Sequence, residues 1–281
     1  GTNTYSGTAF VNAGVLGVRS AAALGLSNAV SVGSGAVFEL QAGTGSMVLG
    51  SSLFTTLAGG TLRASSGNAA LNGSLVLSDS AALEVSAGSL TLGGTLSGGT
   101  ALLAKSGQGM LVFGSSYTTS GSLTVSSGGL ILRRSVSLGG LTMADNTSLL
   151  VNVGGTSELT AVSLSTLLGA TTWGTWGNAL QLDTANAGTI GQTLTSSVLL
   201  GSGTLVKSGS GALVLNGSVS AGSIGIAAGT LQLSAAAHPG GSAFTIAAGG
   251  SLSFANLTNG SQPLTGIISG AGSLNVTGGT L

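Results

Sequence analysis

Two stretches of this chain carry the same motif: Leu103-Ala-Lys105-Ser-Gly-Gln-Gly-Met-Leu111-Val and Leu205-Val-Lys207-Ser-Gly-Ser-Gly-Ala-Leu213-Val. A second motif, glycine, six residues, glycine, any residue, leucine, follows each of them and also stands near the start of the chain. Its three copies are Gly7-Gly14-Leu16, Gly121-Gly128-Leu130 and Gly222-Gly229-Leu231. Glycine and leucine motifs that return along a chain predict a solenoid, in which each unit buries its apolar side against its neighbours.

Apolar residues alternate with polar ones over three to five positions, as in Leu130/Leu132 and Leu231/Leu233, which is typical of half-buried strands. Turn-forming Ser-Gly, Asn-Gly, Ala-Gly and Gly-Gly pairs separate these strands. Short strands at this spacing fit a sandwich, an antiparallel barrel or a β-helix. The uniformly short strands, the repeated motifs and the scarcity of charge favour the β-helix.

The fold that we predict is all-β: a right-handed parallel β-helix with three strands in each coil. At about 20 to 30 residues per coil, the chain of 281 residues would make roughly 9 to 14 coils. We expect one β-helix segment over 1–281, with glycines at corners that need a positive φ and at close contacts between coils. The motifs at both ends indicate that this segment belongs to a longer protein.

The composition favours a folded chain, because hydrophobic residues make up 42% of it and the formal net charge is zero. It contains 52 glycines, 12 charged residues and no cysteine. Without cysteine, disulfides and thiolate chemistry are excluded, and most zinc sites with them. No apolar stretch approaches the roughly 18 to 20 residues of a membrane-spanning helix, so we do not expect this segment to cross a membrane.

The least regular stretch is 154–197, which holds Trp173 and Trp176 in Thr-Thr-Trp-Gly-Thr-Trp-Gly. One interpretation is a loop that presents both indoles to a ligand such as a glycan. The other, which we favour, is an irregular coil whose tryptophans cover a widened core. These two tryptophans are the leading candidate ligand-binding residues that the sequence offers.

The pattern from Leu205 to Gly217, followed by Gly222, Gly229 and Leu231, resembles the autotransporter-associated β-strand repeat. The first 16 residues resemble it too. This repeat occurs in passenger domains of bacterial autotransporters and in very large surface proteins. The resemblance implies a right-handed parallel β-helix displayed outside the cell, and it implies no catalytic residue.

Residues that perform chemistry are scarce. The one histidine, His238, precedes Pro239 and Gly240, which favours a solvated turn over a catalytic triad. Arg133-Arg134 is too small a basic group for nucleic-acid binding. Lys105 and Lys207 hold equivalent motif positions, and we interpret them as outward charges that discourage sheet pairing, with anionic glycan binding as the alternative.

Two further kinds of site find little support. Glycosidic cleavage requires two converging carboxylates, to be drawn from Glu39, Asp79, Glu84, Asp145, Glu158 and Asp183. Among these, Asp79 and Glu84 lie closest in sequence, but solubilisation of the surface is the simpler explanation. The Gly-x-Gly pairs are followed by Leu or Met and therefore match neither a calcium-binding β-roll nor a dinucleotide fingerprint. We expect no catalytic residue, cofactor or metal.

The leading hypothesis is a non-enzymatic structural rod or stalk on, or outside, a bacterial surface. Its partners would be flanking repeats or copies of itself, stacked end to end as a filament, because open coil ends are unpaired strand edges. The second hypothesis is an adhesin module that binds glycans or a host surface through Trp173 and Trp176. An ice-binding solenoid and a glycan-cleaving enzyme are the remaining, weaker alternatives.

Overall fold

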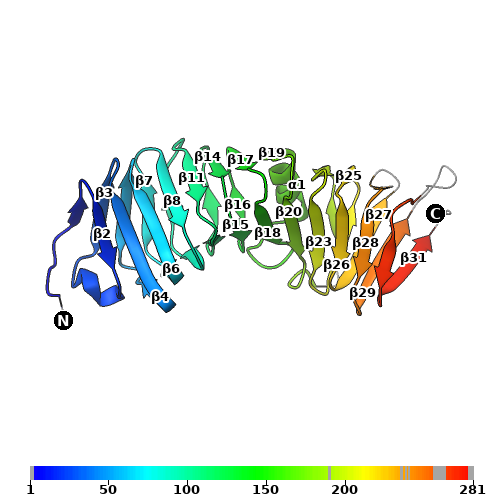
Figure 1. Ribbon diagram of the computed structural model, residues 1–281, viewed down its shortest axis with the longest axis horizontal. Coiled ribbons are helices and arrows are strands. Elements are labelled where there is room, and N and C mark those ends of the chain that lie inside the picture. Colours follow the sequence, from blue (N-terminus) through cyan, green and yellow to red (C-terminus); the bar gives the residue numbers. More distant parts are fainter. Residues whose placement is uncertain are drawn as a thin grey trace. The chain divides into compact units, whose positions relative to one another are not determined.

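The computed structural model describes residues 3–188, 191–234, 237, 239, 241–255 and 264–277. It is mostly β with one short α-helix, and it is a parallel β-solenoid of about 12 turns (Figure 1). This confirms the predicted fold, and the number of turns lies within the predicted range. Two compact units, Gly1–Thr142 and Met143–Leu281, are distinguished by their internal contacts. Each is described by itself below, and the expectation of one segment over 1–281 stays a prediction.

Unit 1 consists of short strands and one turn of 3-10 helix. Their bounds are β1 (Ala9–Val11), β2 (Val15–Val18), η1 (Ala21–Leu24), β3 (Ala29–Gly33), β4 (Val37–Leu49), β5 (Phe54–Ala58), β6 (Thr61–Leu71), β7 (Ser74–Leu77), β8 (Ala81–Val85), β9 (Ser89–Leu92), β10 (Leu96–Ser97), β11 (Leu103–Ser106), β12 (Met110–Phe113), β13 (Tyr117–Thr118), β14 (Ser122–Val125), β15 (Gly129–Leu132), β16 (Val136–Ser137) and β17 (Gly140–Met143), which spans the division.

A coil of unit 1 contributes one strand to each of three faces. The coil β10, β11, β12 shows this clearly, since its strands pair in parallel with β7, β8 and β9 of the preceding coil. The longer strands β4 and β6 run around a corner, with register shifts near Gln41, and so serve two faces each. The predicted three strands per coil are therefore present in unit 1.

Unit 2 contains the α-helix and the remaining strands. Their bounds are β18 (Ser148–Asn152), α1 (Ala161–Gly169), β19 (Thr171–Trp173), β20 (Ala179–Asp183), β21 (Gln192–Leu194), β22 (Val198–Leu199), β23 (Thr204–Ser208), β24 (Ala212–Leu215), β25 (Val219–Ser220), β26 (Ser223–Ile226), β27 (Gly229–Ser234), β28 (Ala243–Ile246), β29 (Gly250–Ala255), β30 (Ile268–Gly270) and β31 (Ser273–Thr277).

Aliphatic side chains stack in columns inside each unit. In unit 1, Leu111 pairs with Leu90 and Leu130, which lie 21 and 19 positions away, and all three side chains are fully buried. In unit 2, one buried column joins five successive coils: Leu149, Leu180, Leu205, Ile224 and Phe244. Each such side chain removes apolar surface from water by contact with the coil before and the coil after it.

The two glycines of the second motif have different physical roles. Gly128 has a φ of +70° and makes the corner between β14 and β15, where a side chain would be strained. Gly121 has no positive φ, but a Cβ there would lie 2.0 Å from the carbonyl oxygen of Ala101 in the preceding coil. Corner formation and close stacking, both expected from the sequence, thus fall on separate positions of the motif.

Helix α1 replaces a strand within the predicted irregular stretch, 154–197. It lies against β21, the edge strand of the sheet β21-β24-β27-β29-β31. Thr160 caps the helix by accepting a hydrogen bond from the Ser163 backbone N–H at 3.1 Å. A helix over a sheet edge blocks further strand pairing there. This helix was not predicted from the sequence.

Candidate functional site

The two tryptophans of unit 2 differ in exposure. Trp173 ends strand β19 and is half-buried, whereas Trp176 lies three residues later in the corner before β20 and is 67% exposed. No ring contact joins the two indoles in the described part of the chain. The structure therefore separates the pair that the sequence grouped, and only Trp176 presents most of its surface to solvent.

Asp145 holds the corner that carries Trp176. Its Oδ1 atom accepts hydrogen bonds from the backbone N–H of Thr175 at 2.6 Å and from that of Trp176 at 3.2 Å. The Thr175 hydroxyl donates to the same oxygen at 3.4 Å. In return, the carbonyl of Trp176 accepts from the Asn146 backbone N–H at 2.8 Å. These bonds join two successive coils at one corner.

Two glycines allow the tryptophan corner to lie this close to the preceding coil. A Cβ at Gly174 would be 2.3 Å from Asp145 Oδ1, and one at Gly177 would be 2.2 Å from Asn146 Oδ1. Gly177 also has a φ of +67°. The backbone beneath Trp176 is thus fixed both by hydrogen bonds and by close contact.

Asn178 closes the same corner from inside. Its side-chain NH2 group donates to the Ala144 carbonyl at 2.7 Å and to the Thr147 hydroxyl at 3.1 Å. The side chain is only 1% exposed, and its Oδ1 atom has no hydrogen-bond partner in the described structure. In the next coil, Gly203 lies against the backbone carbonyl of Asn178, since a Cβ at Gly203 would be 2.3 Å from that oxygen.

The predicted positions of Lys105 and Lys207 are wrong. Both side chains are completely buried and point into the coil, so neither is an outward charge nor part of an anionic-glycan surface. Lys105 Nζ donates to the carbonyls of Gly107, Gly109 and Ser127 at 2.5, 2.6 and 2.7 Å. Since Ser127 belongs to the next coil, one ammonium group joins two corners.

Lys207 repeats this arrangement in unit 2. Its Nζ donates to the carbonyls of Ser208, Gly209 and Ala228 at 2.8, 2.7 and 3.0 Å. Burial lowers the pKa of Lys105 to about 8. Burial likewise lowers the pKa of Lys207 to about 8, although the charge of Asp183 acts in the opposite direction. These lysines bind backbone carbonyls, so we assign them to the fold and not to ligand binding.

Each of the six acidic side chains accepts a hydrogen bond or takes part in an ion pair within the fold. Glu84 accepts from Arg63 at 2.7 Å, and the strand register puts Glu39 on the other side of Arg63. Glu158 is buried, and the side-chain amides of Asn152 and Asn186 donate to its Oε1 atom at 3.3 and 2.6 Å.

Asp79, the carboxylate closest to Glu84 in sequence, is exposed and accepts from the backbone N–H of Ser80 at 2.6 Å. Asp183 accepts from the backbone N–H of Ala185 at 2.9 Å. His238 lies outside the described residues. Among those that are described, no group of three or more His, Cys, Asp or Glu side chains could hold a metal ion.

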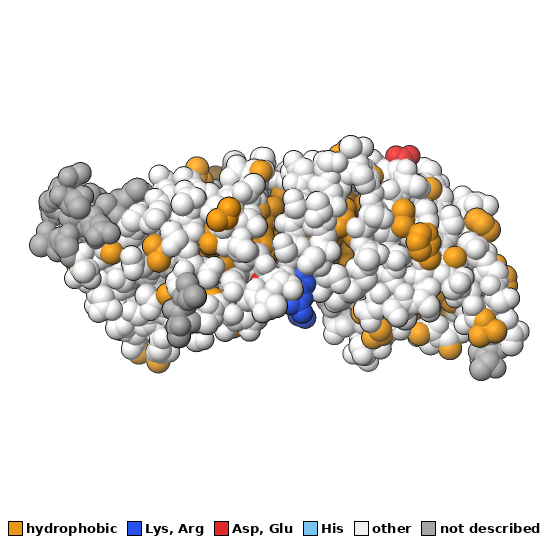
Figure 2. Space-filling model, turned by 180° about the vertical axis from the view of Figure 1, so that it is seen from behind, with side chains coloured by type: hydrophobic (Ala, Val, Ile, Leu, Met, Phe, Trp, Pro, Cys, Tyr) orange, Lys and Arg blue, Asp and Glu red, His pale blue; other side chains and the backbone are white. Residues whose placement is uncertain are grey.

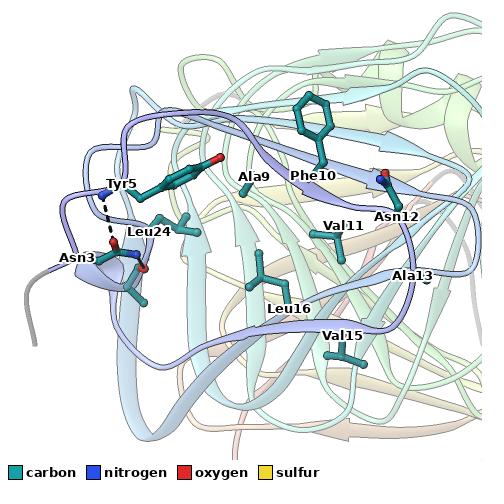
Figure 3. A pocket seen from close by; sticks show the side chains of 11 residues that line it. Asn3, Tyr5, Ala9, Phe10, Val11, Asn12, Ala13, Val15, Leu16 and Leu24 are labelled. Atoms are coloured by element: carbon teal, nitrogen blue, oxygen red, sulfur yellow. Dashed lines mark hydrogen bonds between the residues drawn. The ribbon is translucent and has the colours of Figure 1, made fainter.

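A hollow of about 410 Å³ opens at the first described coil (Figure 3). Leu16, Val11 and Leu24 point into the coil there, whereas Phe10 and Val15 point away from it. Leu16 pairs with the fully buried Phe38 on one side only. The hollow is therefore the uncovered end of the apolar column, with no acid, base or cation in its lining.

The surface offers few other candidates. On the face shown in Figure 2, apolar side chains are dispersed and charged side chains are few. No helix in the described structure is both long and apolar enough to cross a membrane. Comparisons with protein-family models, with curated proteins and with solved structures found no match for this chain.

Proposed function

We propose that this chain is a structural segment of a bacterial surface or secreted protein of the autotransporter type, in which it serves as a non-enzymatic stalk. The observation that carries the proposal is the coil-on-coil stacking of each unit, with parallel backbone ladders outside and buried aliphatic columns inside. Such a stack transmits load through hydrogen bonds between neighbouring coils. The resemblance of the motifs to the autotransporter-associated repeat supports the placement outside the cell.

The partners that we propose are flanking repeats or further copies of the chain, stacked on the coil ends. The uncovered hollow around Leu16 supports this, because apolar side chains there lack the neighbouring coil that buries their counterparts elsewhere. At the other end, Leu274 and Val276 stand in register with the buried Leu252 and Phe254 but are 42% and 41% exposed. A further coil at either end would bury these side chains.

Small-angle X-ray scattering of the 281-residue chain tests the stalk. About 12 turns at a coil spacing of about 4.8 Å should give an elongated particle with a body roughly 60 Å long. A compact, isotropic particle would refute the proposal. Protease treatment of intact cells that produce the whole protein tests its location, since a segment protected until the cells are lysed is not on the surface.

End-to-end stacking has its own test. Sedimentation velocity over a range of concentrations should show association that Leu16→Lys abolishes, because this change puts a charge into the uncovered column. Val15→Lys is the matched control on the same strand, since Val15 points outward and is 56% exposed. Monomers at all concentrations, or equal association of both variants, would contradict stacking of copies.

The second candidate function is recognition of a cell surface or glycan through the tryptophan corner. One observation favours it: Trp176 is 67% exposed on a backbone fixed by Asp145. A buried indole would have supported the structural interpretation, which now applies only to the half-buried Trp173.

A further inference from the structure

We propose that Trp176 and Asp145 form a binding site for a pyranose ring of a neutral glycan. This inference rests on the second candidate function and narrows it to one corner, one indole and one class of sugar. Trp173 has no role in the site, because it lies half-buried on β19 and makes no ring contact with Trp176.

The first argument is preorganisation. An indole offers a large, rigid apolar face with a polar N–H, and binding is strongest when the ring is held before the ligand arrives. The corner under Trp176 is held by two backbone N–H bonds to Asp145 and by the close contacts of Gly174 and Gly177. The indole is therefore carried on a fixed backbone and not on a long loop.

The second argument concerns hydrogen bonds. Asp145 Oδ1 takes all three bonds from the corner, whereas Oδ2 takes part in none of the hydrogen bonds described. Asp145 is exposed, so Oδ2 faces a ligand or water. A carboxylate accepts strongly from hydroxyl groups. A pyranose supplies both matching features, an apolar C–H face for the indole and hydroxyls at the ring edge for Oδ2.

The surroundings of the corner also suit a hydroxylated ligand better than an apolar protein surface. Thr175, Asn146 and Ser202 are exposed polar residues on three successive coils. Ser202 belongs to the next corner, whose Gly201 lies against the Thr175 carbonyl. The hydroxyl and amide groups of these side chains can donate to and accept from the hydroxyls of a sugar.

The third argument favours a neutral glycan over an acidic one. The chain has six Lys and Arg residues, and only Lys207 lies beyond position 142. Lys207 is completely buried and bound to carbonyls. The same part of the chain carries three carboxylates, Asp145, Glu158 and Asp183. Unit 2 therefore has no exposed Lys or Arg to attract a sulfate or uronate, and its carboxylates favour a neutral sugar over an acidic one.

Affinity gel electrophoresis of the full chain is the test, with gels that contain laminarin, glucomannan, xylan or dextran as neutral probes and alginate or heparin as acidic ones. We expect retardation by at least one neutral polysaccharide and by neither acidic one. Trp176→Ala should weaken that binding at least 10-fold, Trp176→Phe should restore most of it, and Asp145→Asn should weaken it about 3-fold or more. Val162→Ala is the matched control, because Val162 is 76% exposed on α1, in the same unit.

Circular dichroism establishes that each variant is folded before it is compared. Three results would overturn the proposal: no neutral polysaccharide retards the chain, the acidic probes bind better, or Trp176→Ala binds as the parent does. None of these results would refute the proposed stalk, because X-ray scattering measures the length of the particle independently of Trp176. Conversely, a compact particle that binds glucomannan through Trp176 would refute the stalk and leave this site intact.

Discussion

Replacing Lys105 by methionine should change how the stability of this chain depends on pH. Methionine keeps an apolar stem of similar length but removes the ammonium group from the carbonyls of Gly107, Gly109 and Ser127. Those groups then lose a donor, at a cost of about 1–3 kcal/mol for each that stays unsatisfied. Gly109 still accepts from the Gly129 backbone N–H at 3.3 Å, so at most two carbonyls are affected in full.

An opposing contribution comes from the charge. The pKa of Lys105 falls from 10.5 to about 8 on folding, so burying the charged form at pH 7 costs about 3 kcal/mol. Methionine removes this cost. At neutral pH the loss of hydrogen bonds and the relief of desolvation therefore nearly cancel. We expect the free energies of unfolding of the variant and the parent to agree within about 2 kcal/mol.

The two proteins diverge as the pH rises. Between about pH 8 and 10.5, Lys105 is neutral in the folded chain and charged in the unfolded one, so unfolding takes up a proton and the parent gains stability. From pH 7 to pH 10 this gain is about 2–3 kcal/mol for one lysine. Lys105→Met should lack it. Lys207→Met should lack the corresponding gain in unit 2, because the pKa of Lys207 is also lowered to about 8.

Urea unfolding at pH 7, 8, 9 and 10, followed by circular dichroism, measures this difference. Both tryptophans lie in unit 2, so their fluorescence reports the unit that contains Lys207. Burial raises the pKa of Tyr117, and its titration above pH 10 lowers stability equally in the parent and the variants. Parallel pH profiles for the parent and both variants would show that burial does not desolvate these ammonium groups.

Three further predictions concern packing and charge. Gly121→Ala should lower the free energy of unfolding by about 3 kcal/mol, since its Cβ would lie 2.0 Å from a carbonyl oxygen of the preceding coil. Gly14 has a φ of +71° but open space around it, so Gly14→Ala should lower the same free energy by only about 1–2 kcal/mol, as measured by thermal unfolding. Leu164→Ala should lower the free energy of unfolding by about 2–5 kcal/mol, because it leaves a cavity on the buried side of α1. Val162 is exposed on the same helix, so Val162→Ala should change this free energy by less than about 0.5 kcal/mol. Arg63→Ala should lower the free energy of unfolding by at most about 1 kcal/mol, because Arg63 and Glu84 form a partly exposed ion pair. This loss should become smaller in about 0.5 M salt, which screens surface charges, and a loss that stays the same would contradict a surface ion pair.

The sequence alone was sufficient for the solenoid because its signal is redundant. Period-two alternation marks Leu111, Leu130, Leu213 and Leu231 as inward, and all four are fully buried in parallel ladders. An error at one strand changes little when a dozen neighbouring strands carry the same pattern. The number of coils followed from length alone, since each coil must make three short strands and three corners.

The same alternation, applied strictly, would have placed the lysines correctly. Leu103 and Lys105 are two positions apart on one strand, so both side chains point the same way, and Leu103 is buried. We instead expected the charged side chains to lie outside, against this alternation, and that prediction was wrong. A second signal was present as well: the Gly-x-Gly that follows each lysine supplies exposed carbonyls at a tight corner, which is where a buried ammonium group can be satisfied.

Helix α1 and the tryptophan corner were harder to predict from the sequence. Leu164, Leu167 and Leu168 follow helical spacing after a capping Thr160, but the abundance of glycine elsewhere led to a chain without helices. The anchoring of Trp176 by Asp145 could not be predicted, because the two residues are 31 positions apart across a coil that contains the helix. Neither residue type nor local spacing indicates that contact.

The lysine positions also show how a solenoid accommodates coils of unequal length. Lys105 pairs with Val125, and Met110 pairs with Gly129, so five steps of one coil face four steps of the next. Lys207 and Ala212 face Ile226 and Thr230 with the same difference. Where a corner shortens by one residue, not every carbonyl finds a backbone N–H: Gly109 and Ser208 accept from Gly129 and Thr184, whereas no such bond is described for Gly107 or Ser127. A long side chain with three donors satisfies the remaining carbonyls from inside, whereas an aliphatic residue would offer them no donor. The first motif is therefore best understood as the sequence of a corner that faces a corner one residue shorter in the next coil.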